Sequence, residues 1–293
     1  MKINKMTMLI LVLFSVTMMA NMAEPAWARA EGYEVYACID AWVGPSPVDW
    51  RYGELTGVMD KEYPKGTPHS FYYIRGRDLE IAFGTGFSDP KKSIREDKWK
   101  WLNVIGVKEC LAKIGVDPSK VKMVVLGNLH HTSTHGIDAF PQATFIVQKS
   151  DWEFFFGQAR RHPYLMMAAH QNHLDQLEDL ERQGRIQLVD GDTEIAPGIH
   201  FYLAPGHTPG NSFMTIETSA GKVILAGETV MTYKQLKEDL PLGFALNLIA
   251  AFDSYEKLRR ILGPSDALLF PGSDEKVISR FRQTAPGLLK IAP

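Results

Sequence analysis

The sequence predicts an α/β protein with helices outside its β-sheets. Segments rich in β-branched and aromatic residues alternate with segments of helical periodicity through both halves of the chain. Of the 293 residues, 45% are hydrophobic and 23% are charged, a composition typical of a globular protein with a sizeable core. No repeat, low-complexity run or linker follows the first 30 residues. We therefore expect a single domain over residues 31–293.

The first 30 residues have the pattern of an export signal. Lys2 and Lys5 precede an uncharged run, Met6–Ala20, and alanines spaced two apart follow at Ala26–Ala30. The apolar run is short for a membrane span. We expect the segment to be removed and the mature protein to be exported, periplasmic or secreted, without stable membrane insertion. An uncleaved anchor is the alternative.

The net charge argues against nucleic acid as a partner, and the cysteine content leaves open whether a disulfide forms. The formal net charge is -2, which provides no basic field for nucleic acid. Cys38 and Cys110 are the two cysteines of the chain. An oxidising compartment permits a disulfide between them, but their separation does not imply one, and a buried free thiol is an equal alternative.

In the first half of the chain, strands precede a helix and one further strand. Turn residues and periodicity predict a strand at Tyr33–Val43, a hairpin at His69–Phe87 centred on Arg75-Gly76-Arg77, a helix at Ile94–Ile114 and a short buried strand within Lys120–Asn128.

In the second half, strands again alternate with helices. The same signals predict a strand and the start of a helix within Ala143–Phe156, a helix at Pro163–Gln183, several strands within Arg185–Thr229, a helix at Ala251–Gly263, a strand and loop at Asp266–Glu275 and a last helix at Lys276–Gln283.

Five segments in order carry a family resemblance. These are "LEIAFGTGFSD", "CLAKIGVDPSKVKMVVLGNLH", "LAPGHTPGNSFMTIET", "KVILAGETV" and "ALLFPGSDE". The chain resembles the metallo-β-lactamase fold superfamily and, within it, the acyl-homoserine-lactone lactonase branch. Gly84 departs from the usual Asp of the first segment. The resemblance implies an αββα sandwich of two mixed β-sheets flanked by helices.

The metal-binding motif of that family, His-x-His-x-Asp-His, is incomplete in this chain. The flanking segments align the metal positions, in order, with Asn128, His130, Thr132, Ser133, His207, Glu228 and Ser273. Thr132, Ser133 and Ser273 would form one of the two metal positions, and their neutral hydroxyls are poor ligands. We therefore expect no second metal.

The resemblance implies one divalent metal at the other position. Asn128, His130, His207 and Glu228 would hold it, since two imidazoles, a carboxylate and water suffice for zinc, and the same set suits iron. Asn128 would add a weak carbonyl ligand or orient the water. A metal-free descendant of the family is the alternative.

The proton acceptor of the reaction is harder to assign. Thr132 replaces the usual Asp and cannot readily accept a proton, so Glu228, His131 or His135 would act, and we favour His135. An alternative alignment places His130 and His135 on the first and third histidines of the motif, but it breaks the flank spacing. His170 and His173 are one helical turn apart, a spacing that binds metals but is more typical of a polar helix face.

These residues predict a hydrolase that attacks a small lactone, ester or similarly activated substrate with one metal-bound hydroxide. The alternatives are a metal-free periplasmic binding protein for small molecules and a mononuclear non-haem iron enzyme. Residues Trp152–Gln183, rich in Phe, Met and Leu, would cap the site, or else make ordinary helix packing or a homodimer contact. Where the lactonases have a substrate-binding Tyr, the chain has Met231, with Tyr233 two residues later.

Overall fold

The computed structural model describes residues 32–43, 67–91, 101–264 except Met167, and 268–293. The predicted export signal and the start of the helix predicted from Ile94 lie outside these residues. No helix among the described residues has both the length and the apolar character needed to cross a membrane.

The larger of two β-sheets is mixed. Its strand order is β13 (Arg282–Ala285), β14 (Leu288–Ala292), β1 (Glu34–Val43), β2 (Thr67–Gly76), β3 (Leu79–Phe83), β5 (Met123–Val125), β6 (Thr144–Gln148) and β7 (Ile186–Val189), and β4 (Trp101–Leu102) pairs with the end of β1. Strands β3, β5, β6 and β7 are parallel to one another, and the pairs from β13 to β3 are antiparallel.

The second sheet is also mixed. Its order is β12 (Leu269–Pro271), β11 (Gly221–Gly227), β10 (Ser212–Thr218), β9 (Ile199–Leu203) and β8 (Thr193–Ala196). Only the pair of β11 and β12 is parallel among these strands.

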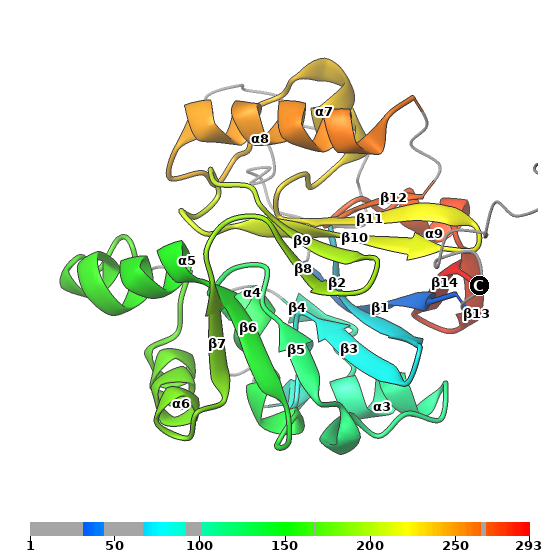
Figure 1. Cartoon of the computed structure of the whole chain (residues 1–293), viewed down its shortest axis with the longest axis horizontal. Coiled ribbons are helices and arrows are strands. Elements are labelled where there is room, and N and C mark those ends of the chain that lie inside the picture. Colours follow the sequence, from blue (N-terminus) through cyan, green and yellow to red (C-terminus); the bar gives the residue numbers. More distant parts are fainter. Residues whose placement is uncertain (1–31, 44–66, 92–100, 167, 265–267) are drawn as a thin grey trace, which may run out of the picture. The chain divides into compact units, whose positions relative to one another are not determined.

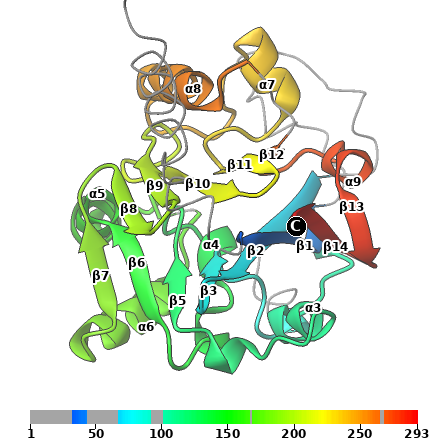
Figure 2. The same ribbon diagram turned by 45° about the vertical axis from the view of Figure 1, so that its right-hand side comes forward.

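Helices cover the outer face of each sheet (Figures 1 and 2). Helices α3 (Val107–Ala112) and α6 (Gln171–Arg182) pack on the larger sheet, and α7 (Tyr233–Glu238) and α8 (Leu248–Leu262) pack on the second. The shorter helices are α4 (His131–Thr134), α5 (Lys149–Glu153), η3 (Pro118–Lys120), η4 (Ile137–Ala139), η5 (Phe154–Gln158), η6 (Ala159–Arg161) and α9 (Val277–Arg280).

Alternation along the strands builds the layers. In β5, Val124 packs towards the helices and Val125 packs between the sheets, and in β11 Ile224 and Leu225 divide in the same way. Successive side chains of a strand point to opposite faces, so a strand covered on both faces is apolar at every position. The αββα sandwich predicted from the resemblance is therefore confirmed.

Three predicted helices are shorter than expected. Within the described part of Ile94–Ile114, Trp101–Leu102 is strand and the helix begins at Val107. Helix α6 begins at Gln171 rather than Pro163, since the backbone of His170 is extended. The last predicted helix, Lys276–Gln283, is reduced to α9, Val277–Arg280. After α9 the chain forms β13 and β14, which the sequence did not predict.

A disulfide joins Cys38 of β1 to Cys110 of α3, with 6.4 Å between their Cα atoms. Both residues are buried in the core between the larger sheet and its helices. The alternative of a free thiol at Cys110 is therefore wrong. The bond closes a loop across a sequence separation of 72 residues.

Candidate functional site

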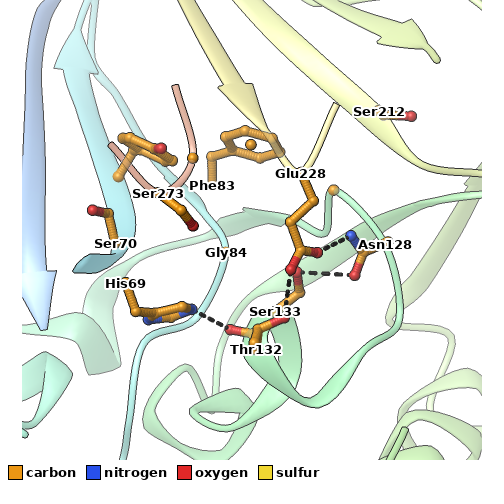
Figure 3. Close-up of a pocket in the computed structure, with 14 residues that line it drawn as sticks. His69, Ser70, Phe83, Gly84, Asn128, Thr132, Ser133, Ser212, Glu228 and Ser273 are labelled. Atoms are coloured by element: carbon orange, nitrogen blue, oxygen red, sulfur yellow. Dashed lines mark hydrogen bonds between the residues drawn. The ribbon is translucent and has the colours of Figure 1, made fainter. Parts of the chain in front are cut away.

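The candidate site lies where several strands end (Figure 3). The segments after β3, β5, β11 and β12 contribute Gly84, Asn128, Glu228 and Ser273 to one pocket. Two of these segments touch closely: a Cβ atom on Gly272 would lie 2.2 Å from the carbonyl oxygen of Gly227. Glycine at position 272 thus allows the loops that carry Glu228 and Ser273 to meet.

The first group of candidate ligands, here called the carboxylate cluster, consists of His130, His207 and Glu228. His130 Nδ1 lies 2.9 Å from His207 Nε2, which lies 3.2 Å from Glu228 Oε2. One ligand atom from each residue lies within 4.8 Å of the others. The two histidines are buried, and the Glu228 side chain is 20% exposed. The structure therefore brings together three of the four predicted ligands at the mouth of a pocket.

Hydrogen bonds fix which atom of His207 faces the cluster. Its Nδ1 donates to the carbonyl oxygen of Phe244, so Nε2 is the nitrogen that points at His130 and Glu228. Burial opposes a positive charge on His207, but the Glu228 carboxylate and this carbonyl raise its pKa above the ordinary value. In the metal-free protein, a proton on Nε2 therefore occupies the place that a metal ion would take.

The proton on His207 shifts the pKa values of the other two residues of the carboxylate cluster, His130 and Glu228. Burial and the nearby charge of His207 hold the pKa of His130 well below its ordinary value, so His130 is neutral. Burial works against the charge of Glu228, but His207, His130 and the Asn128 amide together hold its pKa well below the usual range. An ionised carboxylate and two imidazoles, each of which can be neutral, fit the ligand set of a zinc or iron ion.

A buried carboxyl group ties the two histidine loops together. Asp151 Oδ2 accepts from the backbone N–H of Leu129 at 3.1 Å and from Thr208 Oγ1 at 3.0 Å, and Oδ1 accepts from the N–H of Gly210. Burial raises the pKa of Asp151 to about 6 despite these hydrogen bonds. Asp151 thus positions His130 and His207 through their neighbours, and the sequence did not single it out.

Asn128 has a different role from the predicted weak ligand. Its amide nitrogen donates to Glu228 Oε2 and to Asn211 Oδ1, the latter at 3.2 Å. Its carbonyl oxygen accepts from the backbone N–H of His130 at 3.0 Å and from Ser133 Oγ at 3.3 Å. In this arrangement Asn128 orients Glu228, and coordination by Asn128 stays a prediction.

The hydroxyls at the second metal position act as donors or line the pocket. Thr132 Oγ1 donates to Glu228 Oε1 at 3.3 Å, as Figure 3 shows. Ser133 donates to Asn128, and Ser273 lines the same pocket.

His135 lies in different surroundings from the carboxylate cluster, and its role as the proton acceptor stays a prediction. It follows α4, and its ring stacks on Phe87 with centroids 4.6 Å apart. It belongs to a different group, with His170 and His173. His130 and His135 are the cap residues at opposite ends of α4, so the two side chains face different surroundings.

The structure adds an Asp–His pair that the sequence analysis missed. His69 Nδ1 lies 2.7 Å from Asp40 Oδ1. Its Nε2 lies 3.1 Å from the carbonyl oxygen of Thr132, a contact that Figure 3 draws. Nε2 faces a carbonyl oxygen and therefore carries a hydrogen, whereas the proton between Nδ1 and Asp40 is shared by the pair, because burial also raises the pKa of Asp40. Burial opposes a positive charge on the ring, but Asp40 raises the pKa of His69. The available signal was a lone Asp inside the apolar strand Tyr33–Val43.

Met231 and Tyr233, at and near the position of the substrate-binding Tyr of the lactonases, are not among the residues that line the pocket of Figure 3. Met231 is fully buried, and the Tyr233 hydroxyl donates to the carbonyl oxygen of Leu269 at 2.8 Å. The segment predicted as a cap contributes Phe155, which lies edge-on to His130. Most of its buried apolar residues pack in the core beside α3, which supports ordinary helix packing.

Comparison with known proteins gives consistent matches. Residues 64–273 match the family model described as the Metallo-beta-lactamase superfamily. An N-acyl homoserine lactonase from Bacillus thuringiensis is 26% identical over 168 residues, covering 56% of this chain and 60% of that protein. One from Bacillus cereus is 25% identical over 219 residues, covering 74% and 76%. The chain thus spans about 60% of the length of the first of these relatives.

A solved structure shares the fold. The dizinc quorum-quenching lactonase AidC, in complex with a product, superposes with a TM-score of 0.67 at 17% identity, over 90% of this chain and 96% of that one. At this identity the match concerns the fold alone.

Proposed function

Because this chain belongs to the metallo-beta-lactamase superfamily, we propose that it is a metal-dependent hydrolase that opens a small lactone or ester with a single metal ion. The observation that carries the proposal is the convergence of His130, His207 and Glu228 on one point beside a pocket. The relatives named as lactonases support the substrate class.

The carboxylate cluster would hold the ion. A bound divalent metal supplies Lewis acidity, which polarises a carbonyl and lowers the pKa of a coordinated water to about 7. Asn128 and Thr132 each donate to one oxygen of Glu228, so the carboxylate is held in one orientation. Of the three predicted proton acceptors, His131 and Glu228 both line a pocket beside the cluster. We propose Glu228 for this role, because its carboxylate lies against His207.

His69 would compensate in part for the missing second ion. It lines the same pocket wall as Thr132, Ser133 and Ser273, where the chain has hydroxyls in place of ligands. Asp40 raises the pKa of His69, and a proton on His69 would favour anionic charge in the pocket, such as the charge that develops on a substrate oxygen during carbonyl attack.

A metal-free binding protein is the second candidate, and one observation favours it. Glu228 accepts from Asn128, Thr132 and His207, so its hydrogen bonds are satisfied without an ion. A mononuclear iron enzyme is a variant of the first candidate, because two imidazoles and a carboxylate also suit ferrous iron.

We also propose that the protein is exported and works on a small molecule. Its N-terminal pattern supports export, and the Cys38–Cys110 disulfide is of a kind that persists in oxidising compartments. Homodimer formation stays a prediction.

The test is metal content together with hydrolysis by the full chain after purification and reconstitution with zinc or iron. We expect hydrolysis of an N-acyl homoserine lactone or of a simpler lactone. His207→Ala and Glu228→Gln should lower both activity and bound metal, whereas His162→Ala, at an exposed position, should change neither. Full metal and full turnover in the first two variants would show that the assignment is wrong.

A further inference from the structure

A second group of histidines lies apart from the carboxylate cluster. His135, His170 and His173, here called the histidine cluster, each offer a ring nitrogen within 4.8 Å of the others. His135 and His173 are buried, and His170 is partly exposed. Two of the residues come from the start of α6 and one from the end of α4.

A hydrogen-bonded threonine sets the tautomer of His173. Thr134 Oγ1 donates its proton to the carbonyl oxygen of His130 at 3.0 Å, and it lies 3.0 Å from His173 Nδ1. The hydroxyl has one proton, so at His173 it must accept, and Nδ1 carries the hydrogen. The lone pair of His173 is therefore on Nε2, and a second partner that fixes the ligating nitrogen in this way is characteristic of metal-bound histidine.

The other two rings are held by stacking. His170 stacks on His131 with centroids 4.9 Å apart and planes 12° apart. His135 stacks on Phe87 at 28°. The three rings of the histidine cluster are thus each oriented by a neighbour from outside the cluster, so little order remains to be imposed when an ion binds.

We propose that His135, His170 and His173 form a second metal site, which binds a divalent transition-metal ion such as Zn²⁺ through three imidazoles and fixes α4 to α6. Zinc–nitrogen bonds of about 2.0–2.1 Å in tetrahedral geometry separate two ligating nitrogens by about 3.4 Å. The ligand atoms lie within 4.8 Å of one another, so rotations of the rings that bring them closer by up to about 1.4 Å would close the set. Three neutral nitrogen ligands favour zinc, copper or nickel over magnesium and calcium, which prefer oxygen.

The site would stabilise a weak element. Helix α4 has four residues, too few to be stable without tertiary contacts. His130, from the carboxylate cluster, is its N-cap residue, and His135 is its C-cap residue. An ion at the histidine cluster would anchor the C-terminal end of α4 to α6 and so help to hold His130 in place.

Zinc stoichiometry of the purified full chain, measured by elemental analysis after reconstitution and dialysis, tests the proposal. His170→Asn should lower the zinc content by one equivalent in the wild-type background and also in a His207→Ala background. His170 is partly exposed, so its replacement should be tolerated even where a change at the buried His173 prevents folding. His162→Ala is the matched histidine control and should change nothing.

The two sites can fail separately. Loss of zinc in His170→Asn with full zinc in His207→Ala would support the histidine cluster and contradict the carboxylate cluster. Equal zinc in wild type and His170→Asn would overturn the present proposal, and the rings would then form a stacked imidazole cluster only. A cobalt absorption spectrum that loses one component in His170→Asn, but not in His162→Ala, would confirm imidazole coordination.

Discussion

His207 Nε2 lies 3.2 Å from Glu228 Oε2, so an imidazole and a carboxylate from different loops form a buried ion pair at the pocket. The partners have opposite pKa shifts, because each stabilises the charge of the other. In the metal-free protein the pair therefore holds a proton at the place where an ion would bind.

Zinc affinity should depend steeply on pH. Binding must displace the proton from His207, whose pKa is raised above 6.5, so affinity should fall as the pH decreases through that raised value. Zinc titration against a chelator at several pH values measures this. In Glu228→Gln the pKa of His207 should be lower, and the fall should move to lower pH. Affinity that is independent of pH between about 6 and 8 would contradict the ion pair.

Asp151→Asn should weaken zinc binding by roughly 10- to 100-fold, the range typical of outer-shell partners of metal ligands. Both oxygens of Asp151 accept hydrogen bonds, and the amide NH2 group of Asn would face one of these donors without being able to accept from it. The loops of His130 and His207 would then separate. Zinc titration measures the effect. Asp138→Asn, at an exposed position shortly after α4, is the control. Unchanged affinity in Asp151→Asn would show that the loops hold their positions without it.

His69→Gln should lower stability most at acidic pH. A histidine whose pKa is raised by folding contributes its full stabilisation below the unfolded value of about 6.5 and loses it as the pH rises through the raised value. Urea unfolding of wild type and variant at several pH values measures the difference, which should shrink with rising pH. Asp40→Asn should remove the same dependence. A difference that grows with pH would mean that His69 is neutral.

Removing the disulfide by the double change Cys38→Ala and Cys110→Ala should reduce the free energy of unfolding by about 2–4 kcal/mol. The bond links β1 to α3 across a long loop, so its loss enlarges the unfolded ensemble. Urea unfolding measures the change, and wild type in a reducing agent is the matched comparison. An identical midpoint with and without reductant would show that the bond adds no stability.

Most strands could be predicted from the sequence because alternation and turn residues are local signals, whereas the αββα sandwich of two sheets was implied by the family resemblance. Strand β14 could not be predicted, since it pairs with β1 from the other end of the chain. Trp101–Leu102 fitted a helical pattern, but pairing with the end of β1 makes it strand. The start of α6 depends on the extended backbone at His170, which periodicity does not report.

At the site, the flanking segments predicted that His130, His207 and Glu228 would lie together, and the structure brings their ligand atoms within 4.8 Å, because motif spacing within a fold family carries geometry. They could not show that Asp40 lies against His69, or that Asp151 joins two loops, because these contacts connect residues far apart in sequence. The surroundings of His135 could not be predicted, since a position in a loop does not indicate the direction of the side chain.

The three hydroxyl residues at the second metal position have a consequence for redesign. Thr132, Ser133 and Ser273 still line the pocket, so a dinuclear centre would need Thr132→Asp, Ser133→His and Ser273→His. A fourth change, at His69, would favour the second ion, because Asp40 raises the pKa of His69 and a protonated ring would repel an incoming cation. Return to the two-ion chemistry therefore requires several coordinated substitutions, and intermediate variants that keep His69 would place a cation beside a ring that Asp40 makes easier to protonate.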